Sequence, residues 1–366
     1  MNPKRNKSLL SRPIATVLLC AIVLELLNVI GSGPAIAQHQ WDTWTFGSHG
    51  CLDVGSGEAR PLKPSAINTN EGCASISDPQ TGELLFYTDG ETIWNGDHIV
   101  VANLSRIEGL RSGVTITTTQ AALILPRPGY AGQYYLFSLE ASDAPFQGDS
   151  LYDARLFMSI VDISAWQEGR GSTAGGARVQ IKRSAPVEHW LNEKLTAVPH
   201  PDGCSWWVIC HRRYTNEFVA LLVGSQGIEE RVVTAVGSVS RSGGQLKASP
   251  DGAMLAMGSF PLKGQPIASL STQLFRFDAR RGVPFDPIEI QSSHHGYGIS
   301  FSPDSRKLYV AMAMNSFGVP DTVVQYDVSV YDSATIDLGR VVILQSIDSA
   351  IDRYKLGALQ LAPNGR

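Results

Sequence analysis

Short runs of apolar residues, separated by turn residues, recur along this chain. The stretch ISFSPDSRKLYVA (residues 299–311) has two apolar runs around a Ser-Pro-Asp-Ser turn, and LKASPDGAMLAMG (residues 246–258) repeats the phrase. Apolar runs of this length around a Pro-Asp-Gly type turn predict β-hairpins. Because one hairpin cannot bury both of its faces, a recurring hairpin predicts an assembly of stacked sheets.

The hairpin turns are spaced at about the length of a propeller blade. Six turn prolines mark the hairpins: Pro79, Pro128, Pro201, Pro250, Pro303 and Pro363. Neighbouring prolines are separated by 49 residues (79 to 128) at the closest and by 73 (128 to 201) at the widest. A four-stranded blade takes roughly 40–50 residues, and inserted loops lengthen it. Outer strands are predicted at residues 155–164, 217–227, 272–282 and 322–330. We therefore predict an all-β fold, a β-propeller of four-stranded blades of which about six are visible and the last is incomplete.

The composition agrees with this fold. The chain has 366 residues, of which 43% are hydrophobic and 17% charged, and it contains 35 Gly and 20 Pro. This excludes a disordered chain or a coiled coil, and it favours many short strands with tight turns over long helices.

The first 37 residues have the pattern of an export signal. Basic residues precede an apolar stretch at residues 14–30, and an Ala-x-Ala sequence ends at Ala37. We predict a signal peptide at residues 1–37 and one propeller domain at residues 38–366, which is secreted, periplasmic or at the cell surface. The apolar stretch is long for a signal, so an uncleaved anchor is the alternative, although Glu25 and Asn28 weaken it as a span. We expect no membrane span after Ala37.

Removing the leader changes the charge. The leader takes with it four basic residues and one acidic residue, so the formal net charge of −4 becomes −7. A chain with this balance has no basic footprint, and we expect no nucleic-acid partner.

Four cysteines remain after the leader: Cys51, Cys73, Cys204 and Cys210. In an oxidising compartment they are possible disulfide cysteines, but the pairing cannot be deduced from sequence. The alternative is that they are small buried apolar residues, and Cys204 and Cys210 would then lie on one face of a strand.

Sequence motifs for catalysis or metal binding are missing. The chain has no nucleophile elbow, phosphate loop or His-Glu-x-x-His motif. The pairs His294–His295 and His200–His211 lack the close spacing of metal ligands. We expect no metal and no cofactor.

The best candidates for ligand binding lie where the innermost strands begin. These strands would line the central channel, and polar residues precede or open them: Glu71, Gln120, Glu193, Lys194, Gln245 and Tyr297. They would gather around one mouth of the channel, either to bind a ligand or simply as hydrated groups. Trp44, Trp94 and Trp190 could stack on sugars if exposed, or belong to the blade core.

The order of several segments resembles a known family. WTFGSHGCLDV, NTNEGCASISDPQTGELLFYTDGETIWN, TQAALILPRPG, NEKLTAVPHPDGCSWWVI, LKASPDG, FSPDSRKLYV and LGALQLAPNG follow one another as in the WD40-like, SPDG-repeat propeller module of exported bacterial surface proteins. The resemblance covers residues 41–366 and is most specific at residues 68–95. It implies a surface location, a binding role and no established catalytic residues. In that family PKD-type domains often follow.

The resemblance also implies seven blades for the full module. The family continues past the LAPNG turn, whereas this chain stops at Arg366. The expectation is a propeller truncated at its C-terminal end, with the strand at residues 41–47 as the candidate for pairing with that end.

These observations predict a non-catalytic binding or scaffolding propeller that recognises a protein or a glycan at the cell surface. The alternative is a lactonase-like or glycan-cleaving enzyme with its site at the central channel. Converging carboxylates with a metal would favour the enzyme, and scattered polar groups in a wet channel would favour the binding protein.

Overall fold

The computed structural model describes residues 39–365, apart from residues 56, 107–109, 114, 116, 143–152, 164–184, 241–242, 259–271, 291–295, 313–321, 346–355 and 364. The predicted signal peptide lies outside the described residues, and so does the His294–His295 pair. No helix in the described ranges is long and apolar enough to cross a membrane.

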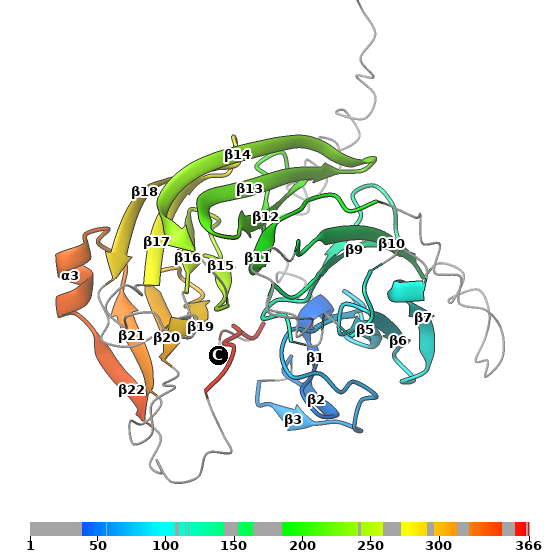
Figure 1. Cartoon of the computed structure of the whole chain (residues 1–366). Coiled ribbons are helices and arrows are strands. Elements are labelled where there is room, and N and C mark those ends of the chain that lie inside the picture. The colour runs from blue at the N-terminus through cyan, green and yellow to red at the C-terminus, as the bar shows by residue number, and fades with distance from the viewer. Residues whose placement is uncertain are drawn as a thin grey trace, which may run out of the picture.

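Six antiparallel sheets stand around a common centre and form a six-bladed β-propeller (Figure 1). Blade 1 contains β1 (Thr43–Phe46), β2 (Gly50–Asp53) and β3 (Arg60–Pro61). Blade 2 contains β4 (Ala74–Ser77), β5 (Leu84–Thr88), β6 (Thr92–Asn95) and β7 (Val100–Asn103). Blade 3 contains β8 (Ala122–Pro126), β9 (Gln133–Leu139) and β10 (Leu156–Asp162).

Blade 4 contains β11 (Leu191–Pro199), β12 (Trp206–Arg212), β13 (Thr215–Gly224) and β14 (Gly227–Ser240). Blade 5 contains β15 (Leu246–Ala248), β16 (Met254–Met257), β17 (Thr272–Asp278) and β18 (Val283–Ile290). Blade 6 contains β19 (Gly296–Phe301), β20 (Lys307–Met312), β21 (Thr322–Asp327) and β22 (Val341–Gln345). The described helices are short: η1 (His39–Trp41), η2 (Leu104–Arg106) and α3 (Ser333–Leu338). The predicted all-β propeller fold is confirmed.

The first strand of each blade lies innermost. These strands follow one another in chain order, since β1 contacts β4, β4 contacts β8, β8 contacts β11, β11 contacts β15 and β15 contacts β19. Strands within a blade are antiparallel and keep the order of the sequence. The start of a first strand, the end of a second strand and the start of a third therefore share one face of the ring. We call this face the entry face.

Blade 1 is the main difference from the predicted set of blades. The sixth predicted hairpin, at residues 359–365, forms no strand, and its Leu359 N–H donates to Gln245 Oε1 beside β19 (3.0 Å). The strand predicted at residues 41–47 instead starts a sheet of its own. In the described part of the chain it pairs with β2 and not with the chain end. Gly47 (φ +55°) and His49 (φ +62°) form the turn, so no Pro-Asp-Gly sequence marks it.

The Ser-Pro-Asp turns of the opening pattern are fixed by their own side chains. The hydroxyl of Ser249 donates to Asp251, and it accepts the N–H of Met254 at 2.9 Å. Ser302 and Asp304 repeat this arrangement in blade 6. Such local bonds stabilise a turn independently of the rest of the fold, which is why these hairpins are legible in the sequence.

Apolar layers between adjacent blades form the core. Between blades 3 and 4, for example, Tyr135 and Phe137 share a layer with Leu195 and Val208. Further layers join blades 1 and 2, 2 and 3, 4 and 5, and 5 and 6. Each buried side chain of this size contributes about 1.5–3 kcal/mol.

Strand β22 departs from this pattern. All five of its residues are exposed, and Val341, Val342, Ile343 and Leu344 are each 50–56% exposed. The strand pairs with β21 on one side. It therefore presents aliphatic side chains to solvent on both faces at the outer edge of blade 6.

Candidate functional site

The six predicted channel residues all lie at the entry face, at the starts of innermost strands. Among these residues, Tyr297 makes the contact with the largest separation in sequence. Its hydroxyl lies 3.4 Å from Thr119 Oγ1, 178 residues away, and it also hydrogen-bonds Glu71. Burial and the neighbouring Glu71 charge raise the pKa of Tyr297 above its ordinary value. Tyr297 therefore links blade 6 to the segments that enter blades 2 and 3.

Glu193, in β11, holds two loops of blade 3. Its Oε2 accepts the backbone N–H and the hydroxyl of Thr119, at 3.0 and 2.9 Å. Its Oε1 accepts the N–H and the hydroxyl of Ser142, each at 3.0 Å. Four donors around a buried carboxylate give Glu193 a fixed orientation between blades 3 and 4.

Gln120 and Gln245 connect innermost strands. The Gln120 amide donates to Leu195 O and Leu246 O, at 2.8 and 3.0 Å, and its Oε1 accepts both N–H groups of these residues. Gln245 Oε1 accepts the N–H groups of Ile299 and Leu359, at 2.9 and 3.0 Å. Each glutamine thus acts as a clamp across two segments that follow it around the ring.

Lys194 is completely buried beside this network. Its Nζ donates to the carbonyl oxygens of Gly243 and Gly244, at 2.5 and 3.0 Å. Burial lowers the pKa of Lys194 to about 7, although the charge of Glu193 acts in the opposite direction. The side chain fixes the entry into blade 5. The structure thus brings Glu71, Glu193 and Tyr297 into one polar network, while Gln120, Gln245 and Lys194 hold backbone around it.

The named tryptophans and histidines fall in different environments. Trp94 is buried and stacks on Tyr87, with ring centroids 5.3 Å apart. Trp44 is half-buried, whereas Trp190 is 51% exposed. His200 lies in the turn between β11 and β12, whereas His211 lies near the end of β12 at the other face of the ring, so the two cannot share a metal. Among the described residues, no three His, Cys, Asp or Glu side chains are grouped to hold a metal ion.

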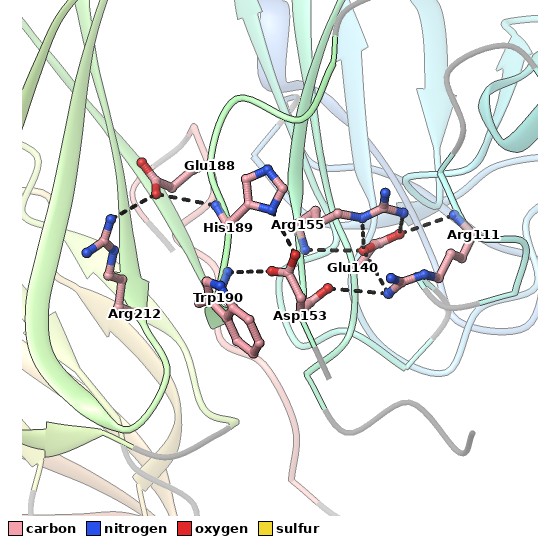
Figure 2. Close-up of polar contacts among 8 residues, drawn as sticks. All are labelled: Arg111, Glu140, Asp153, Arg155, Glu188, His189, Trp190 and Arg212. Atoms are coloured by element: carbon pink, nitrogen blue, oxygen red, sulfur yellow. Dashed lines mark hydrogen bonds and ion pairs between the residues drawn. The ribbon is translucent and has the colours of Figure 1, made fainter. Parts of the chain in front are cut away.

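A second polar cluster lies at the entry face, between blades 3 and 4 (Figure 2). Glu140, just after β9, is completely buried, and Arg155 contacts both of its carboxylate oxygens at 2.6 and 2.9 Å. The guanidinium of Arg111 lies 3.6 Å from the same carboxylate, and its Nη1 donates to the carbonyl oxygen of Asp153. Two guanidinium groups therefore compensate one buried charge.

Asp153 fixes the exposed part of this cluster. Its Oδ1 accepts the N–H of Trp190 at 2.7 Å, and its Oδ2 lies 2.8 Å from Nδ1 of His189 (Figure 2). Trp190 has a left-handed backbone (φ +58°), which is uncommon for a bulky residue. Asp153 therefore holds the His189 ring and the backbone of Trp190 in fixed positions.

Glu188 is the acidic residue of this cluster that pairs with arginines of blade 4. It lies 3.2 Å from Arg212 and 2.7 Å from Arg231, which are themselves part-exposed. Burial acts to raise the pKa of Glu188, but the hydrogen bonds from Arg231, His189 and Arg212 outweigh it and lower the pKa. The charges at this site are thus paired within the protein.

Sequence reasoning named Trp190 but missed Asp153, His189 and Glu140. Asp153 and His189 are 36 residues apart in the chain and follow no known spacing. The sequence did carry one indication of this site, which is the His189–Trp190 pair immediately before β11. Residues at the start of an innermost strand lie at the entry face. The partners come from the neighbouring blade, which the sequence does not reveal.

The four cysteines behave as small apolar residues. No disulfide joins any two of them in the described structure. Cys51 and Cys210 are buried, and burial raises the pKa of Cys73 to about 12. Cys204 lies in the turn before β12, so it does not share a strand face with Cys210.

Comparison with known proteins does not assign this chain to a family. No family of known proteins and no curated protein matches this sequence. Among solved structures, a Bacteroides fragilis protein provisionally named as a 6-phosphogluconolactonase is 14% identical over 89% of this chain and 98% of that chain, with a TM-score of 0.38. A Lactobacillus plantarum protein is 14% identical over 81% of this chain and 76% of that chain, with a TM-score of 0.41. The Dos1 propeller is 11% identical over 86% of this chain and 67% of that chain, with a TM-score of 0.38. These likenesses concern the fold alone.

Proposed function

We propose that this chain is a non-catalytic β-propeller that is exported and binds a protein or a glycan at the cell surface. The binding surface is the entry face of blades 3 and 4. The observation that carries the proposal is Trp190, whose indole is half-exposed and whose left-handed backbone donates its N–H to Asp153, the carboxylate that also contacts His189. Strained, exposed and rigidly supported side chains are typical of ligand-binding positions.

The resemblance of residues 41–366 to surface propeller modules supports the location, as does the predicted leader at residues 1–37. The loops that meet at the entry face come from rigid strands, which is the usual way in which a scaffold presents a binding surface. The channel-mouth network of Glu71, Glu193 and Tyr297 would support this surface from below the loops.

The enzymatic alternative is a lactonase-like or glycan-cleaving site at the channel. Catalytic acids need a carboxyl group whose oxygens can reach substrate. Both oxygens of Glu193 already accept two hydrogen bonds each, and Glu140 is covered by Arg155. This arrangement favours binding over acid–base catalysis.

The proposal can be tested with the full chain and immobilised cell envelopes of a Gram-negative bacterium. We expect retention of the wild-type chain and at least tenfold weaker retention of the Asp153→Ala/His189→Ala double variant. A Lys307→Met variant, altered at an exposed ion pair of blade 6, is the matched control and should bind like wild type.

Treating the envelopes beforehand identifies the partner class. Loss of binding after protease treatment indicates a protein, and loss after periodate oxidation indicates a glycan. Wild-type retention no stronger than that of the double variant would overturn the binding proposal. Release of cleaved sugars or of hydrolysed lactone from the envelopes would overturn its non-catalytic part.

A further inference from the structure

Two exposed aromatic residues lie on neighbouring turns of the entry face of blade 4. Trp190 precedes β11 and is 51% exposed, and Tyr214, between β12 and β13, is 41% exposed. The N–H of Arg213 donates to Trp190 O at 2.8 Å. This bond joins the two turns, so the backbones of Trp190 and Tyr214 lie close together on the entry face.

The backbone of both aromatic residues is held in place. Trp190 (φ +58°) and Tyr214 (φ +60°) are both left-handed. Asp153 accepts the N–H of Trp190 at 2.7 Å, and Ser240 O accepts the N–H of Tyr214 at 2.9 Å. Left-handed backbone costs about 1–3 kcal/mol for a residue of this kind, and it persists only where the surroundings enforce it. The backbone of both residues is therefore ordered before a ligand binds, and only rotation of the side chains remains to be restricted.

Polar groups with fixed positions border the rings. The Arg213 guanidinium lies 4.7 Å from the centre of the Tyr214 ring and donates to Ser142 O. The His189 ring lies against Asp153 at 2.8 Å. Because Arg213 covers one face of the Tyr214 ring, a ligand at this surface would meet the other face of Tyr214 and the indole of Trp190, with hydrogen-bonding groups nearby. A pyranose ring has the matching chemistry, because its C–H groups form an apolar face and its hydroxyl groups form the rim.

The charges of the site favour an uncharged ligand. Asp153 is paired with His189, Glu140 with Arg155, and Glu188 with Arg212. A cationic ligand would have to compete with these pairs, and the formal net charge of −7 that the chain has without the predicted leader would repel a polyanion.

We infer that Trp190 and Tyr214 form a two-point stacking platform for a neutral glycan chain. The inference rests on the proposed function and names the ligand class of the same site. It assigns stacking to the two rings and hydroxyl contacts to His189 and Arg213.

The test uses pentasaccharides of β-1,4-linked glucose, of β-1,4-linked N-acetylglucosamine and of α-1,4-linked galacturonic acid. Calorimetry and quenching of tryptophan fluorescence measure binding to the full chain. We expect at least one neutral pentasaccharide to bind. Trp190→Ala and Tyr214→Ala should each weaken it about tenfold, since an aromatic contact contributes about 0.5–1.5 kcal/mol beyond its buried area.

Tyr130→Ala is the matched control. Tyr130 is 38% exposed and lies under an arginine, Arg127, at 3.8 Å, but it belongs to the β8–β9 turn on the opposite face. It should leave binding unchanged. Binding of the galacturonate chain alone, of no sugar, or of a neutral sugar with unchanged affinity in both entry-face variants would each overturn the inference. Retention on envelopes that is lost only after protease would overturn it while leaving the proposed function intact.

Discussion

Lys194 and His211 are completely buried in blade 4, and both have a lowered pKa. Burial lowers the pKa of Lys194 from 10.5 to about 7. Burial and the nearby Lys194 charge lower the pKa of His211 from 6.5 to about 3. The unfolded chain therefore binds more protons than the folded chain between pH 3 and 6.5 at His211, and between pH 7 and 10.5 at Lys194. In both windows stability rises with pH.

We expect Lys194→Met to flatten the upper window. Urea unfolding at several pH values between 7 and 10 should show a rising free energy of unfolding for wild type and a smaller rise for the variant. Lys307→Met, at an exposed lysine, should keep the wild-type slope. Equal slopes for wild type and Lys194→Met would mean that the buried amine does not titrate in this range.

Glu140 should be far more important for stability than an exposed acid. Its side chain is fully covered, and Arg155 beside it is 18% exposed. Glu140→Gln leaves a largely buried guanidinium without its counter-charge, and we expect a loss of about 3–5 kcal/mol in chemical denaturation. Asp286→Asn removes the exposed pair with Arg276 and should cost less than about 1 kcal/mol. Similar losses for the two variants would contradict this assignment.

At the scale of elements, the glutamine clamps join strands that do not belong to the same blade. Gln120 bonds with the N–H and C=O groups of both Leu195 in β11 and Leu246 in β15. The clamp thus lets blade 3 hold blades 4 and 5 together. Gln245 joins β19 and the segment at Leu359 through their N–H groups alone, which its Oε1 accepts.

Replacing Gln120 by Leu should destabilise the fold by about 2–4 kcal/mol, because four backbone groups lose partners near the channel. Thermal unfolding measures this loss. Gln226→Leu, at an exposed turn with only side-chain contacts, should change the midpoint little. A Gln120→Leu variant as stable as Gln226→Leu would show that water replaces the clamp.

The hairpins and the proposed binding site differ in how far the sequence predicts them. The Ser249–Asp251 and Ser302–Asp304 turns are local, so their sequence alone reveals them. The β1–β2 turn uses left-handed Gly47 and His49 and carries no such signal. Asp153 and His189 meet only because blades 3 and 4 pack side by side. Contacts made by packing between blades leave no periodic pattern for sequence reasoning to find.

At the scale of the whole molecule, β22 is an unprotected edge. Natural sheets usually cover an outer strand or place charges on it, because an apolar edge pairs with other chains. Four consecutive aliphatic residues, from Val341 to Leu344, are exposed there.

We expect the Ile343→Lys variant to stay monomeric up to a higher protein concentration than wild type, without a lower melting temperature. Light scattering over a concentration series measures this effect. Tyr309→Lys, on the half-buried β20 of the same blade, should instead lower the melting temperature and not improve solubility. Unchanged association in Ile343→Lys would show that another surface causes it.

The bond between Tyr297 and Thr119 has a consequence for the way the ring comes apart. In a linear repeat protein each unit communicates only with its neighbours, so the units can melt one after another. Here a hydroxyl pair spans 178 residues of chain, and each clamp skips to a second neighbour. Opening one blade therefore disturbs blades on the far side of the channel. The ring should therefore unfold as a single cooperative unit, and the entry face should be lost together with the core.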